Sequence, residues 1–77
     1  MDIKPEYESK TGKQALAHLI EEAGEMIAAA GKTLRFGPDC VNPELPPEQQ
    51  ESNLSWLRRE IADVERAIAK FRDLAGP

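Results

Sequence analysis

Prolines divide this chain into two long segments that are free to form helices. All six prolines lie outside residues 11–35 and 52–74, at Pro5, Pro38, Pro43, Pro46, Pro47 and Pro77. A proline inside a helix removes a hydrogen bond and costs about 3 kcal/mol, so uninterrupted helices are expected only where prolines are absent. The sequence predicts a single all-α domain over residues 1–77, with helices at about 11–35 and 52–74 and a loop at about 36–51.

The first segment has the periodicity of a helix with one buried stripe. Thr11 and Gln14 favour a capping box at its start, with Ser9 as a competing cap. Gly37-Pro38 is a strong stop signal. The apolar residues that recur at three- and four-residue intervals are Leu16, Leu19, Ile20, Ala23, Met26, Ile27 and Ala30.

The second segment follows a connection rich in proline and acidic residues, whose length is unusual inside a compact domain. Pro46-Pro47-Glu48 favours a short preliminary turn, and either Ser52 or Asn53 can cap the following helix. Its apolar stripe consists of Leu57, Ile61, Val64, Ile68 and Phe71, widened by Trp56 and Ala67. The expected unit is therefore a two-helix hairpin.

A single hairpin cannot cover the apolar surface of the first helix. Beside its main stripe, that helix carries small or apolar residues on most of its circumference, namely Ala15, Ala17, Gly24, Ala28 and Ala29. Such a helix expects neighbours on several sides. A second copy would supply them in a four-helix bundle, so we expect a homodimer, or a homotetramer built as a dimer of dimers.

Composition narrows the range of partners. The net charge is −4 and there is no basic block, so a nucleic-acid partner is not expected. No apolar run approaches the roughly 20 residues that span a bilayer, so no membrane partner is expected. Cys40 is the only cysteine, which rules out an internal disulfide and favours a cytoplasmic location. At 77 residues, oligomerisation or a bound metal is the expected source of extra stability.

Two acidic clusters are the most informative side chains. Glu22 and Glu25 are three residues apart, as are Glu60 and Asp63, so each pair lies on one helix face. At about 100° per residue, Glu60 falls inside the apolar stripe, Asp63 lies about 60° away at its edge, and Glu22 borders the stripe of the first helix.

Carboxylates in an apolar stripe need a partner or a metal ion, because their desolvation is costly. A divalent cation with oxygen ligands meets that need. The simpler alternative is a pair of solvated faces neutralised by Arg59 and Arg66.

These motifs resemble the EExxE…ExxD signature of the MazG-like, all-α nucleotide pyrophosphohydrolases. The resemblance covers residues 11–74 and includes Glu21-Glu22-Ala23-Gly24-Glu25, Glu60-Ile61-Ala62-Asp63 and the exit Lys32-Thr33-Leu34-Arg35-Phe36-Gly37-Pro38. It implies hydrolysis of nucleoside triphosphates, deoxy or non-canonical ones included, to the monophosphate and pyrophosphate. It also implies Mg²⁺, with Mn²⁺ as an alternative ion, held by Glu22, Glu25, Glu60 and Asp63. Glu21 or Glu25 would assist as the catalytic base.

Substrate contacts are expected near the loop and the acidic clusters. Arg35 and Lys32 are candidates for phosphate, Phe36 and Trp56 for stacking on a base, and Asn53 and His18 for polar contacts. Each has a simpler role as well: Phe36 and Trp56 would close the bundle ends, Asn53 would cap a helix, and His18 would be a hydrogen-bonded neighbour of the site. The alternative function is a non-catalytic hairpin that binds a nucleotide or a partner protein, in which Glu60 pairs with an arginine.

Overall fold

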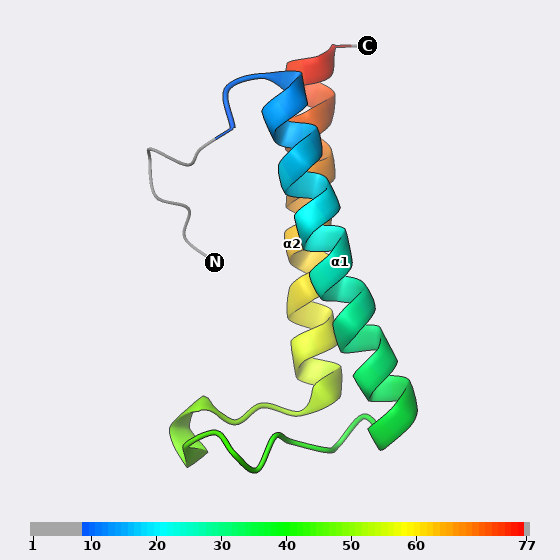
Figure 1. Ribbon diagram of the computed structural model, residues 1–77, viewed down its shortest axis with the longest axis vertical. Coiled ribbons are helices and arrows are strands. Elements are labelled where there is room, and N and C mark those ends of the chain that lie inside the picture. Colours follow the sequence, from blue (N-terminus) through cyan, green and yellow to red (C-terminus); the bar gives the residue numbers. More distant parts are fainter. Residues whose placement is uncertain (1–8, 77) are drawn as a thin grey trace.

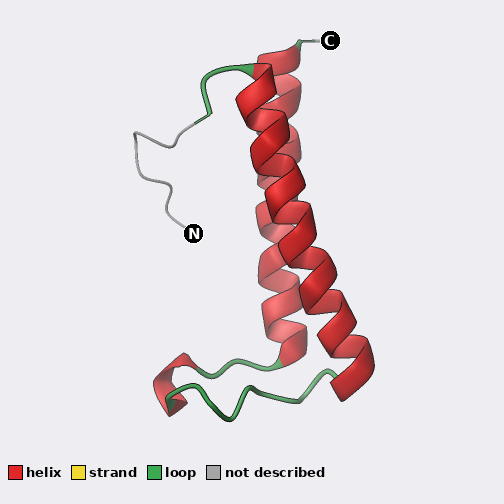
Figure 2. Ribbon diagram, in the orientation of Figure 1, coloured by secondary structure: helices red, strands yellow, loops and turns green. Residues whose placement is uncertain are grey.

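The computed structural model describes residues 9–76, which form a helical hairpin (Figures 1 and 2). Helix α1 runs from Gly12 to Phe36, a short 3₁₀ helix, η2, from Pro47 to Gln49, and helix α2 from Asn53 to Ala75. The long helices run antiparallel, side by side, and no strand occurs within these residues. The all-α class and the two predicted helices are confirmed, as is the preliminary turn at Pro47.

Side-chain caps fix where the helices begin. Thr11 Oγ1 accepts a hydrogen bond from the Gln14 amide (3.1 Å), so Thr11, not Ser9, is the cap of α1. The Gln14 side chain accepts from the Lys10 amide (2.8 Å), one residue before the position expected for a capping box. Ser52 caps α2 by accepting from the Ser55 amide (3.1 Å). The alternative expectation, a cap at Asn53, is therefore wrong.

Asn53 instead ties the end of α1 to the start of α2. It is buried, and its side-chain amide donates to the carbonyls of Lys32 (3.3 Å) and Gly37 (3.1 Å). The Thr33 hydroxyl donates to the backbone carbonyl of Asn53 (3.1 Å). The backbone amide of Asn53 donates to the Cys40 carbonyl (2.8 Å). These bonds satisfy backbone groups that a helix end leaves free, and they hold both ends of the long connection together.

The contact between the helices, which we call the seam, is built on a seven-residue spacing. Ala15, Glu22 and Ala29 of α1 are buried at this spacing, as are Asn53, Glu60 and Ala67 of α2, where Asp63 and Val64 are buried as well. This spacing is that of a coiled-coil contact, in which one face of each helix meets the other at regular intervals. Alanine on both sides lets the helices approach closely. The two glutamates therefore lie between small side chains in the middle of the hairpin.

The apolar stripe predicted for α1 is only partly covered by α2. Leu16, Ile20 and Ile27 are exposed by 42%, 65% and 66%, and Leu34 by 89%. Counting about 100° per residue, these side chains lie about 120–160° round the helix from Glu22. The predicted stripe is therefore not the face that the hairpin buries, because α2 covers the Ala15–Glu22–Ala29 line instead. Helix α1 thus has two apolar faces, of which one is open.

None of the helices described is long and apolar enough to cross a membrane.

Replacing Asn53 by alanine should destabilise the hairpin. The change leaves the carbonyls of Lys32 and Gly37 without their side-chain donor, and such losses cost about 1–3 kcal/mol. The free energy of unfolding, measured by urea denaturation, should fall by about that amount. Asn42→Ala is the matched control, because the Asn42 side chain makes an exposed loop bond to the Glu44 amide (3.0 Å). Equal losses in the two variants would contradict the role assigned to Asn53.

Candidate metal centre

Three carboxylates from the two helices meet in the seam. One oxygen from each of Glu22, Glu25 and Glu60 lies within 4.8 Å of the others. Glu22 and Glu25 are one turn apart on α1, and the antiparallel arrangement brings Glu60 of α2 opposite them. Three of the four predicted metal ligands are therefore brought together.

Burial makes this grouping expensive without a counter-charge. Glu22 and Glu60 are exposed by only 5% and 3%, and neighbouring Asp63 by 5%, whereas Glu25 lies at the exposed edge. Buried charges of one sign strongly disfavour the folded state unless they are paired or bound to a metal. Four like charges in a hairpin this small call for cations nearby.

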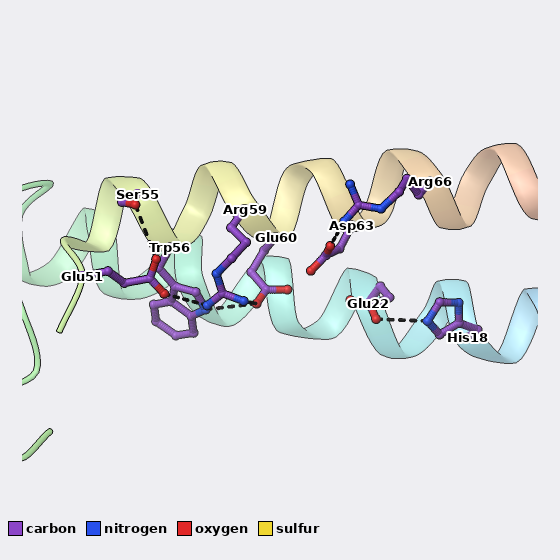
Figure 3. A network of polar contacts seen from close by, with 9 residues as sticks. All are labelled: His18, Glu22, Glu51, Ser55, Trp56, Arg59, Glu60, Asp63 and Arg66. Atoms are coloured by element: carbon purple, nitrogen blue, oxygen red, sulfur yellow. Dashed lines mark hydrogen bonds and ion pairs between the residues drawn. The ribbon is translucent and has the colours of Figure 1, made fainter. Parts of the chain in front are cut away.

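The two buried glutamates each have one oxygen held by a donor four residues earlier in the same helix. The Nε2 of His18 contacts Glu22 Oε1 at 3.0 Å. The Trp56 indole donates to Glu60 Oε1 (3.1 Å), and Arg59 Nη1 approaches the same oxygen at 3.4 Å (Figure 3). Each glutamate is thereby held through one of its two oxygens.

The second oxygen of each buried acid is left without a donor. Asp63 likewise has one oxygen occupied, because Arg66 donates to its Oδ1. Among the residues described, Glu22 Oε2, Glu60 Oε2 and Asp63 Oδ2 are buried with no hydrogen-bond partner. Buried polar atoms nearly always have a partner, so three unpartnered oxygens in one region point to a ligand.

The carboxylates also affect one another's protonation. Partial desolvation raises the pKa of the Glu25 carboxyl above its ordinary value, and the negative charge of Glu22 raises it further. Since Glu25 is exposed as a residue, we give more weight to the repulsion by Glu22 than to desolvation. A cation among these groups would remove that repulsion.

The donor set fits a hard divalent cation. Every side chain in the group offers oxygen, and the free oxygens are single atoms on separate carboxylates. Magnesium binds a few carboxylates and keeps water or phosphate oxygens in its other positions. Asp63 lies beside the group rather than in it, with one oxygen taken by Arg66 and the other free.

A pocket of about 550 Å³ lies between the loop and the adjoining helix ends. The Lys32 ammonium lies 5.8 Å from the Trp56 ring centre, within the range of a cation–π contact. Trp56 and Arg59 line this pocket and also contact Glu60, so the pocket adjoins the carboxylates. Its lining residues are Lys32, Phe36, Cys40, Val41, Asn42, Pro43, Glu44, Leu45, Glu51, Asn53, Trp56 and Arg59.

Of the other seven predicted site residues, five lie either in the pocket or beside the carboxylates. Lys32, Phe36, Asn53 and Trp56 line the pocket, although both donor contacts of the Asn53 amide go to backbone carbonyls. His18 is not among the lining residues and lies beyond Glu22, at the opposite end of the carboxylates from Trp56 (Figure 3).

Two predicted residues belong to neither place. Glu21 is exposed and is not among the grouped carboxylates. The Arg35 guanidinium lies 5.0 Å from the Phe36 ring centre and does not line the pocket.

Sequence reasoning missed Glu51. Its carboxylate accepts from Arg59 (2.6 Å) and so links the loop to the helix that carries Glu60. Glu51 precedes the helix and is eight residues from Arg59, so no helical spacing rule relates the two. Val41 and Leu45 of the pocket were missed as well, because the loop has no periodicity from which to place them.

Comparison of the chain with protein-family models, curated proteins and solved structures finds no match.

Magnesium should raise the melting temperature of the protein, and Glu60→Gln should remove that response. A ligand that binds only the folded state stabilises it by about 2.7 kcal/mol at 100 times its Kd. For a domain of this size each kcal/mol corresponds to about 4–8 °C. Circular dichroism melts with magnesium and with chelator measure the shift. Glu65→Gln, which changes an exposed acid of α2, should respond like the natural chain. If magnesium does not change the melting temperature of the natural chain, the metal centre is ruled out.

Proposed function

We propose that this chain is a magnesium-dependent nucleoside triphosphate pyrophosphohydrolase of the MazG-like kind. The observation that carries the proposal is the set of buried, unpartnered carboxylate oxygens of Glu22, Glu60 and Asp63. Together with Glu25, these acids occupy the positions of the motif on which the resemblance rests. An acidic protein needs a cation in order to bind a polyphosphate, and this is the one region of the described chain where acids gather in that way.

In this proposal Glu22, Glu25 and Glu60 hold the cation and Asp63 joins them through its free oxygen. When bound, magnesium neutralises phosphate charge and lowers the pKa of a water molecule. Glu25 is suited to exchange with solvent and substrate, because it alone of the three grouped acids is exposed. Glu22 and Glu60 are fixed in the seam and provide the rigid part of the site.

The reaction needs a proton acceptor beside the attacking water. The water oxygen forms a bond to the α-phosphorus, and the bond from that phosphorus to the oxygen bridging to the β-phosphorus breaks. Pyrophosphate leaves with the bonding electron pair, and the water proton passes to a carboxylate. Glu25 or Glu21 accepts it, since both are exposed carboxylates beside the proposed cation.

The pocket next to Glu60 is the proposed site for the base and sugar. Trp56 and Phe36 offer aromatic faces there, and Lys32 and Arg59 offer positive charge for phosphate. A volume of about 550 Å³ is in the usual range for small-molecule sites. We assign no phosphate contact to Arg35, which lies over Phe36 outside the lining.

We further propose that two or more hairpins pack through the open face of α1. Ile20, Ile27 and Leu34 are spaced by seven residues along that face and are largely exposed. Gly24 and Gly31 run beside them, and a Cβ added at either glycine would meet nothing within 4 Å. This gives a second helix room to approach, as in a four-helix bundle.

One contact favours the alternative function, a hairpin that binds a partner without catalysis. That alternative expects an arginine on Glu60, and Arg59 lies 3.4 Å from its Oε1. The arginine does not account for Glu60 Oε2, which keeps no partner. The two functions differ in their response to metal, because a purely structural ion pair gains nothing from magnesium.

Pyrophosphate release from a panel of canonical and modified nucleoside triphosphates tests the proposal. Release should require magnesium, stop with chelator, and fall to background in Glu22→Gln and Glu60→Gln, because each variant removes a charged ligand. Glu65→Gln should retain full activity. No release from any nucleotide by the natural chain, with magnesium or manganese present, would leave partner binding as the better account.

Charge on the open face of α1 should break the assembly. Ile20→Glu and Ile27→Glu together would place two carboxylates where we expect a second hairpin to pack. Size-exclusion chromatography with light scattering should show a shift to monomer. Ser55→Glu and Ala69→Glu together are the matched control, because they add the same two charges to exposed positions of α2, about 140–180° from the buried Glu60. A natural chain that is already monomeric would contradict the proposed assembly.

A further inference from the structure

We propose that His18 and Trp56 are positioning residues that commit Glu22 and Glu60 to bind a cation through one oxygen each. This arrangement would favour magnesium over calcium. The inference rests on the proposed metal site, but not on catalysis.

The two donors stand in the same relation to their acids. His18 precedes Glu22 by four residues in α1, and Trp56 precedes Glu60 by four residues in α2. Because the helices are antiparallel, the donors lie at opposite ends of the carboxylates (Figure 3). Each donor contacts Oε1 of its acid, and Oε2 of each acid is buried without a partner.

Both bonds suit the task of fixing a carboxylate. An indole N–H can only donate, so Trp56 is the donor in this bond and Glu60 is the acceptor. Glu60 is 3% exposed and Glu22 is 5% exposed, so water does not compete freely for the held oxygens. Donors behind a metal ligand orient it, and removing one typically weakens metal binding by about 10- to 100-fold.

Holding one oxygen of each acid also sets which cation fits. Calcium takes 6–8 oxygens and commonly uses both oxygens of a carboxylate, whereas magnesium takes six at fixed geometry and keeps several waters. With Oε1 of both glutamates occupied, the site offers few protein oxygens, each from a different side chain. Freeing those oxygens would permit two-oxygen binding and would help calcium more than magnesium.

A purely structural role makes a different prediction. If the bonds only satisfy buried carboxylates, removing a donor lowers the stability of the fold and leaves the ratio of magnesium to calcium affinity unchanged. The affinity ratio therefore separates positioning from simple stabilisation.

Isothermal titration calorimetry of magnesium and of calcium into the full chain tests the inference. Trp56→Phe keeps an aromatic ring and leaves only the longer Arg59 contact (3.4 Å) on Glu60 Oε1, and His18→Ala deletes the donor to Glu22. Each should lower magnesium affinity by about 10-fold or more and calcium affinity by less, so that the ratio falls. His18→Gln restores an N–H donor and should recover magnesium affinity and selectivity. Circular dichroism checks that each variant is folded, and Trp56→Phe decides the question if His18→Ala is not.

The outcomes distinguish this inference from the proposed function. Magnesium affinity and selectivity that are unchanged in folded variants would overturn the positioning role while leaving the metal site intact. A natural chain that binds neither cation would overturn both. Pyrophosphate release is not part of the measurement, so a chain that binds magnesium in this way without turnover would still support the inference.

Discussion

Glu22 and Glu60, exposed by 5% and 3%, face each other in the seam where a helical hairpin would normally place leucine or valine. Their neighbours along the seam are Ala15 and Ala29 in α1, and Asn53 and Ala67 in α2, and the alanines let the helices approach closely. Donors at both ends hold one oxygen of each acid. The seam therefore holds a polar site at positions where the burial of apolar side chains is the usual source of stability.

A small hairpin has little stability to give up in this way. Among the described residues no large side chain is fully buried, and the core consists of Ala15, Ala29, Val64 and Ala67. The Asn53 bonds between the helix ends are one further source of stability. The second copy and the cation that we propose would each add to it. A metal that stabilises only the folded state couples binding to folding. Cation binding at the proposed site would therefore also stabilise the fold.

Periodicity was sufficient to predict the helices, their turn signals and the position of Glu60 within a buried stripe. It was not sufficient to choose between the two apolar faces of α1, because a helix with apolar residues nearly all round fits a partner on either side. Leu16 and Ile27 were expected in the buried stripe, and within the hairpin the Ala15–Glu22–Ala29 line is buried instead. Pattern reasoning favours large apolar residues, whereas the close approach of two helices favours small ones. The role of Asn53 in joining the helix ends was not predicted for a related reason. Its partners lie 16 and 21 residues away, and no helical spacing rule relates residues so far apart.

The loop and the carboxylates are joined through a single turn of α2. Arg59 contacts Glu51 of the loop at 2.6 Å and Glu60 at 3.4 Å, and these acids together raise its pKa, with the Glu51 bond the largest cause. Trp56, one turn earlier, lines the pocket and donates to Glu60. A ligand in the pocket therefore lies against the same two side chains that hold Glu60 in place. Arg59 thus connects the loop to the seam directly, and the pocket between them is lined by both of these side chains.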